Sequence, residues 1–190
     1  LMRGHVFANA QTGNIVLLSQ HIFAENWADV MRYLMPVLSF MFGVAAATEI
    51  RQHFQNIGRI HWRQIVILIE MSMLFLVGFL PGKMDLVANA FVSFSCAMQV
   101  QTFRKVDSYA FASTMCIGNI RSGMEALCAY RQSHNRQILY KAFHYFGIII
   151  LFAFGAGIGS ILIPVFNLQT IWFSSFLLMV GFFLMFIQEK

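Results

Sequence analysis

Five long apolar segments constrain this chain more than any other feature of its sequence. A helix that crosses the roughly 30 Å hydrocarbon core of a bilayer needs about 17–25 mostly apolar residues. Each segment approaches or reaches that length, and short linkers separate them: Tyr33–Ile50, Gln64–Leu80, Leu86–Phe103, Phe143–Phe166 and Thr170–Ile187. We therefore expect an all-α fold, a polytopic membrane helix bundle that forms one membrane domain over residues 1–190.

The composition agrees with a surface that faces membrane lipid. Hydrophobic residues make up 58% of the chain and charged residues 11%, whereas a soluble domain carries about 25% charged residues. The net charge of +5 is spread between the apolar segments, and without a basic run among aromatic residues we expect no nucleic-acid partner. The cysteines, Cys96, Cys116 and Cys128, lack metal-ligand spacing and are odd in number, so no metal, other cofactor or disulfide framework is expected.

Two shorter segments, Asn14–Phe23 and Asn119–Tyr130, are apolar only in part. Each follows a glycine and opens with asparagine, a residue that caps the free N–H groups at a helix start. Ten to twelve residues are too few to span a bilayer. Two interpretations stay open: re-entrant helices shielded by protein, or amphipathic helices on the membrane surface.

The two halves of the chain repeat each other. Thr12–Ile15 matches Ile117–Ile120, and Phe40–Thr48 matches Phe152–Ser160, with seven additional residues between the matches in the second half. Such ordered matches indicate an internal repeat, with a first repeat over residues 1–82 and a second over residues 83–190. The second half has a span ahead of its Gly-Asn pair and the first half has none. Since the chain also begins at Leu1 rather than Met, we expect that a first transmembrane helix is missing.

The basic residues give each half a direction, because cytoplasmic loops are rich in Lys and Arg. If the loop Arg51–Arg63 is cytoplasmic and Asn119–Tyr130 does not cross, ten basic residues lie inside and three outside. The inside set is Arg51, Arg59, Arg63, Arg104, Lys105, Arg121, Arg131, Arg136, Lys141 and Lys190. The outside set is Arg3, Arg32 and Lys83. The two halves then have opposite orientations, which predicts an inverted repeat.

Three segments carry a family resemblance: Gly4–Asn14, Cys96–Gln99 and Tyr109–Asn119. In them the chain resembles the YoaK family, a widespread group of bacterial inner-membrane proteins of unknown function. The likeness covers nearly the whole chain and implies a multi-pass inner-membrane protein with six spans at full length, the first being absent here. Ile117 stands where the family pattern leads us to expect Thr, which weakens any role for a hydroxyl there. The resemblance supplies no substrate.

The paired Gly-Asn segments are the sharpest candidates for a binding site. In inverted-repeat transporters the N-termini of broken helices meet near the midplane, where their positive ends hold anionic groups. We expect a substrate site for a small anionic or zwitterionic solute, lined by Gln11, Thr12, Asn14, Gln99, Asn119 and Arg121. The alternative is that the Gly-Asn pairs only cap two buried helices and fix the fold.

Glu70 is the candidate for ion or proton coupling. A carboxyl group at membrane depth is costly, and such groups are commonly functional, although Glu70 near a span end would also suit contact with Arg63 or interfacial water. The expected function is secondary transport, with membrane lipid and a small solute as partners. The alternative is a non-transport module that binds lipid, senses a signal or assembles with a partner. Self-association is left open. Without a visible nucleophile–base or metal pair, we expect no catalytic residue and no enzyme.

Overall fold

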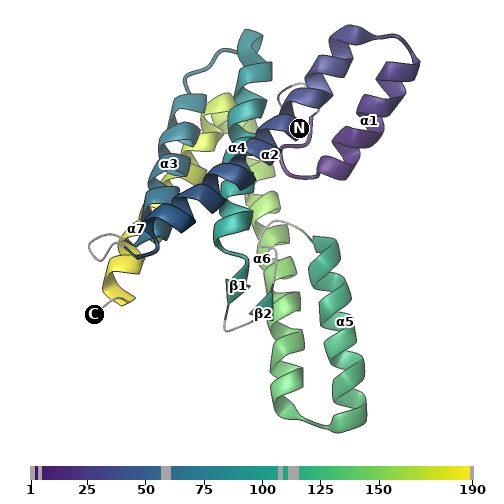
Figure 1. The fold of residues 1–190 in the computed structure, drawn as a ribbon, viewed down its shortest axis with the longest axis vertical. Helices are drawn as coiled ribbons and strands as arrows, with labels where there is room; N and C mark the ends of the chain where they lie inside the picture. Colours follow the sequence, from purple (N-terminus) through teal and green to yellow (C-terminus); the bar gives the residue numbers. More distant parts are fainter. Residues whose placement is uncertain (1–2, 4–5, 57–60, 107–108, 111–115, 189–190) are drawn as a thin grey trace. The chain divides into compact units, whose positions relative to one another are not determined.

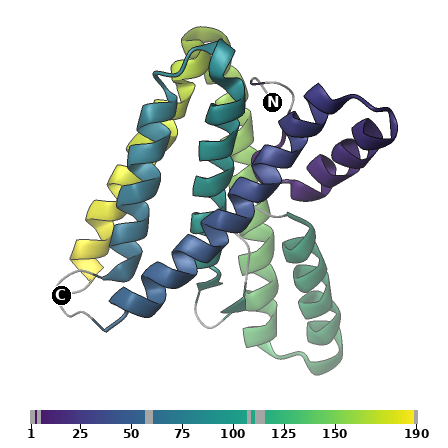
Figure 2. The same cartoon turned by 45° about the horizontal axis from the view of Figure 1, so that its top comes forward.

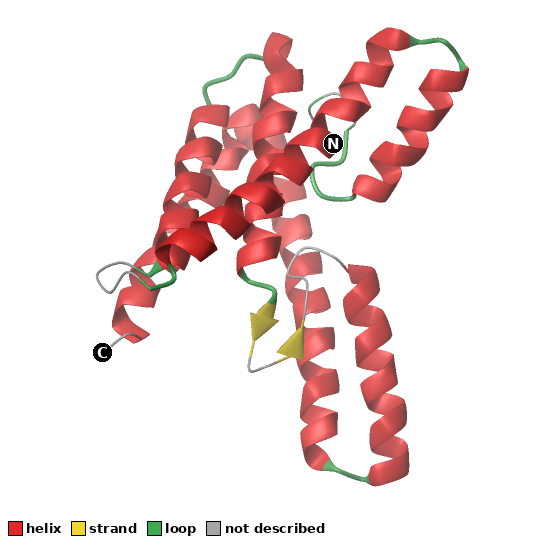
Figure 3. Ribbon diagram, viewed as in Figure 1, coloured by secondary structure: helices red, strands yellow, loops and turns green. Residues whose placement is uncertain are grey.

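A computed structural model describes residues 3, 6–56, 61–106, 109–110 and 116–188. The chain divides into two compact units, the first formed by Leu1–Thr102 with Phe166–Lys190 and the second by Phe103–Val165. This division differs from the repeat boundary after residue 82. The described residues are almost entirely helical (Figures 1 and 3). Their exception is a small antiparallel ladder in the second unit, β1 (Lys105–Val106) with β2 (Tyr109–Ala110).

The expected spans are confirmed as helices. The first unit contains α1 (Gln11–Phe23), α2 (Trp27–Phe54), α3 (Trp62–Val77), α4 (Asp85–Thr102) and α7 (Ile171–Gln188), with short 3-10 turns η1 (Gly82–Met84) and η2 (Asn167–Thr170). The second contains α5 (Cys116–Ser133) and α6 (Arg136–Phe166). Each expected span coincides with one of α2, α3, α4, α6 and α7 to within a few residues at most ends. Both α2 and α6 begin at least six residues earlier than expected, because their polar first turns escape a hydropathy criterion.

In the first unit α2 and α4 run parallel and in close contact. A Cβ atom built on Gly43 of α2 would lie 2.5 Å from the Phe94 carbonyl oxygen and 2.7 Å from the Ala97 Cβ of α4. One turn further on, the Gln101 side chain donates a hydrogen bond to the Thr48 hydroxyl at 2.9 Å. Residue numbers therefore rise together along both helices. Glycine at position 43 permits the backbones to approach, as small residues do between membrane helices.

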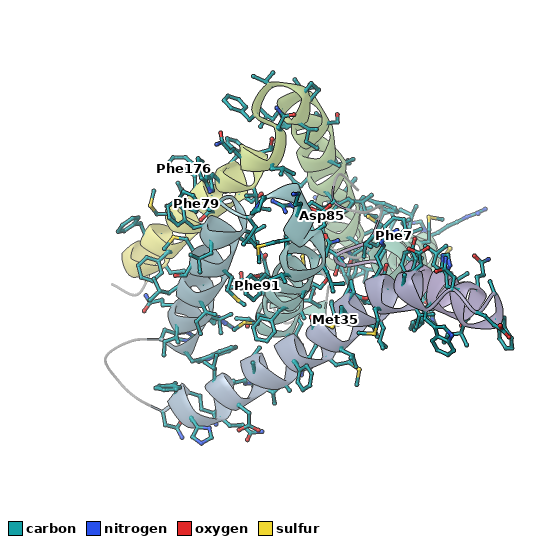
Figure 4. The ribbon with its side chains drawn as sticks, turned by 90° about the horizontal axis from the view of Figure 1, so that it is seen from above. Phe7, Met35, Phe79, Asp85, Phe91 and Phe176 are labelled. Carbon is teal, nitrogen blue, oxygen red and sulfur yellow. The ribbon has the colours of Figure 1, made fainter. Side chains whose placement is uncertain are left out.

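The helix α7 packs antiparallel on α3, and Figure 2 shows the two side by side. The Trp172 indole N–H donates to the Phe75 carbonyl at 3.1 Å, and the Ser175 hydroxyl donates to the Met71 carbonyl at 3.0 Å. Gly78 follows α3, and an added Cβ there would overlap the Trp172 indole. In Figure 4, Phe79 and Phe176 lie on this α3–α7 side of the unit.

The two shorter helices differ from the expected ones in where they begin and how far they run. α1 begins at Gln11 and α5 at Cys116, so Asn14 and Asn119 are each the fourth residue of their helix and neither caps its start. α5 has 18 residues, about 27 Å at 1.5 Å per residue. The expectation that it is too short to span is therefore wrong on length, because the expected segment Asn119–Tyr130 left out three residues at each end.

Each short helix forms a hairpin with the long helix after it, and the two hairpins share details. Both turn at a non-glycine residue with positive φ, Glu25 at 54° and His134 at 51°, and in both an asparagine follows. The buried residues of each hairpin include the fourth residue of its first helix and a pair three positions apart in its second helix. The corresponding residues are Asn14, Val30 and Tyr33 in the α1–α2 hairpin, and Asn119, Ala142 and Tyr145 in the α5–α6 hairpin.

By length and composition, two helical segments of the described chain are long and apolar enough to cross a membrane: Trp27–Phe54, and the continuous run Arg136–Met185 that joins α6 to α7. This finding indicates membrane association and leaves the number of spans open. Large apolar side chains also lie exposed on several helices of the structure, as expected of a surface that faces lipid.

Candidate functional site

The Asn14 side chain is fully buried and engaged by its own neighbourhood. Its amide nitrogen donates to the Phe7 carbonyl at 2.6 Å and to Gln11 Oε1 at 2.9 Å, while its amide oxygen accepts from the Phe7 N–H at 3.2 Å. Gln11 in turn donates to the Ala8 carbonyl. An amide nitrogen has two donors, and both are used. Asn14 therefore fixes the segment before α1 against the helix, whereas Thr12 is solvent-exposed.

Replacing Asn14 by alanine is expected to lower stability without altering ligand preference. The substitution removes both hydrogen bonds to the Phe7 main chain, and a hydrogen bond of this kind contributes about 0.5–1.5 kcal/mol. A lower thermal midpoint in detergent, with the solute profile unchanged, is the expected result. A variant of normal stability that binds a different range of solutes would restore Asn14 to the binding site.

The remaining predicted site residues lie on two helices, one in each unit. Gln99 is half-buried on α4. In the second unit, Asn119 lies on the buried face of α5, which packs on α6 where Gly123 meets Tyr145. Arg121 is exposed and bonded to Glu125 at 2.8 Å, a hydrogen bond that raises the pKa of Arg121. Two positions apart on a helix, Asn119 and Arg121 face nearly opposite directions. Within α5, then, the structure does not bring them to one surface.

Glu70 is the most unusual of the predicted residues. It is the ninth residue of α3, roughly 12 Å along the axis from the helix start, and only 1% exposed. Within the described part of the chain neither carboxyl oxygen has a hydrogen-bond partner. The proposed contact with Arg63 is not found there, since that guanidinium lies over the Trp62 ring at 5.5 Å. The helix α3, which carries Glu70, packs on α4.

Other polar groups share this unusual environment. Buried side-chain atoms that lack a hydrogen-bond partner among the described residues include Gln64 Nε2 on α3, and Ser93 Oγ and Thr102 Oγ1 on α4. Ser95 of α4 has only a weak contact with the Met73 sulfur, at 3.9 Å. Buried polar groups in proteins are nearly always paired. The unpaired groups of α3 and α4 thus mark this helix pair as the polar interior of the first unit.

The sequence did not predict the contacts of Arg3, which joins the end of α3 to the start of α4. Its guanidinium bonds to the Asp85 carboxylate at 3.2 Å, to the Leu80 carbonyl at 2.8 Å and to the Val77 carbonyl at 3.2 Å. The Asn89 amide donates to the Arg3 carbonyl at 3.0 Å. Arg3 thereby neutralises the first turn of α4 and satisfies carbonyls at the end of α3. The sequence feature that could have pointed to Arg3 is that it is one of the three basic residues predicted to lie on the outer side of the membrane.

Metal and disulfide chemistry find no support among the residues that the structure describes. No group of three or more His, Cys, Asp or Glu side chains gathers there as a metal site would require, and the cysteines are free. Some residues that carried predictions lie outside the described part of the chain. They are Gly4, His5 and residues 111–115 of the motif segments, residues 57–60 of the α2–α3 loop, and the terminal Lys190.

Comparison with known proteins gives a family and no function. No curated protein and no solved structure matches the chain. A family model described as "Protein of unknown function (DUF1275)" matches residues 1–184. Membership of the YoaK family, which the three sequence segments indicated, stays a prediction. With nearly its whole length matched, the chain belongs to the DUF1275 family.

Proposed function

We propose that this protein is a multi-pass inner-membrane secondary transporter that couples proton movement to a small anionic or zwitterionic solute. The observation that carries the proposal is Glu70, a carboxyl group buried in the middle of α3 without a hydrogen-bond partner among the described residues. Burying a charge costs several kcal/mol unless it is paired. A carboxyl group that binds and releases a proton during a conformational cycle gives a reason to retain it.

The helix directions support an alternating membrane topology. In the first unit α2, α4 and α7 run one way and α3 runs the other, as a chain that crosses a bilayer repeatedly requires. The α2–α3 loop, with Arg51 and Arg63 beside it, lies at the opposite end from Lys83. The bias of basic residues toward cytoplasmic loops then assigns the α2–α3 end to the inside.

The matched hairpins support an internal repeat, and the opposite orientation of its halves rests on the bias of the basic residues. The fourth-residue positions of Asn14 and Asn119, and the buried residue pairs that follow them, correspond in the two halves. Inverted repeats are a common architecture of secondary transporters, with the coupling and substrate sites between the repeats. Gln99 and Asn119 each stay a prediction as solute contacts, whereas we assign Asn14 and Gln11 to the fold.

A proteoliposome assay tests the proposal. Purified protein is reconstituted into liposomes with an imposed pH gradient, and uptake is measured for amino acids, organic anions and organic cations. We expect gradient-driven uptake of at least one anion or zwitterion above protein-free liposomes. If no solute accumulates although the protein is folded and inserted, the transport proposal fails.

A non-transport module is the second candidate. The closed hydrogen-bond arrangement of Asn14 with Phe7 and Gln11 favours it, because that part of the shared Gly-Asn motif is then structural. A lipid-binding, sensory or assembly role would leave uptake at background in the same assay.

A further inference from the structure

A half-open pocket of about 340 Å³ lies between the first turns of α2 and α4, beside η1, and most of the residues that line it are exposed. We name it the α2–α4 pocket, and it falls entirely in the first unit. Its polar lining comes from Arg32, Lys83, Asp85 and Asn89, and its apolar lining includes Met31 and Leu86. The volume falls in the lower part of the range of small-molecule sites, about 300–1,000 Å³.

The charges in the pocket leave a positive balance. Asp85 is held by Arg3 at 3.2 Å, and Arg32 is paired through one guanidinium nitrogen with Asp29 at 2.8 Å. Lys83 makes no ion pair with any residue that the structure describes. The ammonium of Lys83 and the open edge of Arg32 are thus free to bind an anion.

The parallel course of α2 and α4 adds to this field. Both helices begin beside the pocket, and a helix N-terminus carries partial positive charge. Asn89 is 9% exposed. Its amide nitrogen donates a hydrogen bond to the Arg3 carbonyl, which fixes the Asn89 side chain in the pocket lining. The three basic residues predicted to lie on the outer side of the membrane all belong to this region. Arg32 and Lys83 line the pocket, and Arg3 bonds to its lining.

We propose that the α2–α4 pocket binds the anionic group of a small carboxylate, with Lys83 and Arg32 as the cationic contacts and the apolar wall against its carbon chain. This inference deepens the proposed function and rests on it for the role of the pocket as an outward-facing entry site. Carboxylate binding itself depends only on the geometry and charges above.

Protection of Lys83 from acetylation tests the inference on the full chain in detergent. An amine-reactive acetylating reagent is applied with and without succinate, and mass spectrometry follows Lys83 and, as an internal control, Lys141. A site about 90% occupied leaves about a tenth of its amine free, so we expect acetylation of Lys83 to slow about tenfold at saturating succinate. Lys141 should react at an unchanged rate. Choline, a cation, should give no protection.

Two variants and a lipid control distinguish carboxylate binding in the pocket from other causes of Lys83 protection. Arg32→Ala should abolish the succinate protection, while Arg51→Ala at the opposite end of α2 should preserve it, with circular dichroism confirming the fold of both. The inference is overturned if succinate leaves Lys83 unprotected, or if phosphatidylglycerol alone protects it, which would assign the pocket to a lipid headgroup. Succinate protection of Lys83 without uptake of any solute would retain the pocket and reject transport. Uptake of a solute without protection of Lys83 would retain transport and reject the pocket.

Discussion

Glu70→Gln is expected to reduce gradient-driven uptake to the level of protein-free liposomes. Glutamine keeps the size and shape of the side chain but cannot exchange a proton, so the coupling step that we assign to α3 is lost. Solute exchange without a pH gradient should persist, because that exchange needs no net proton transfer. The measurement is uptake in proteoliposomes, with and without the gradient, at equal protein insertion.

Stability separates this functional role from a structural one. If Glu70 were held by hydrogen bonds, the amide would break them and the thermal midpoint would fall. Since its oxygens have no partner among the described residues, Glu70→Gln should melt at or above the temperature of the unchanged protein. Glu49→Gln is the matched control, because Glu49 is exposed on the surface of α2, where its carboxylate lies 3.7 Å from His53. Retained gradient-driven uptake in Glu70→Gln would contradict proton coupling through this residue.

Most helices were predictable because the property that places them is local. A run of apolar side chains long enough to cross a bilayer identifies a helix wherever the rest of the chain lies, and α3, α4 and α7 follow it closely. The same local criterion predicted that Glu70 lies deep among apolar neighbours. It underestimated α5 by three residues at each end, Cys116–Gly118 and Arg131–Ser133, because a glycine at one end and polar side chains at the other fall outside an apolar run.

The candidate site was less predictable because its contacts join distant residues. Arg3 bonds to residues 74 to 82 positions away, and no local pattern specifies such a partner. Asn14 was expected to cap a helix, since asparagine at a helix start usually bonds the free N–H groups there. Instead it bonds the main chain of Phe7, seven residues earlier. Both are cases in which chain folding, rather than sequence spacing, selects the hydrogen-bond partner.

Gly43 decides whether α2 and α4 can approach closely enough to form the pocket at their N-terminal ends. The atom nearest to an added Cβ is the Phe94 carbonyl oxygen, at 2.5 Å, and the next is the Ala97 Cβ, at 2.7 Å. A backbone oxygen within a helix cannot rotate away as a flexible side chain does. The two helices must separate to admit even one methyl group.

Gly43→Ala is therefore expected to destabilise the protein by about 1–3 kcal/mol, the usual cost of overpacking a filled interface. Gly147→Ala in the interior of α6 is the control, because an added Cβ there meets no atom of the described residues within 4 Å, and alanine is more favourable than glycine in a helix by about 1 kcal/mol. The same substitution should thus act with opposite sign at the two positions, which equilibrium unfolding in mixed micelles would measure. Adding Ala97→Gly to Gly43→Ala should recover only part of the loss, because the Phe94 oxygen remains in place. A stabilising Gly43→Ala would show that α2 and α4 pack less closely than described here, and would remove the structural basis of the α2–α4 pocket.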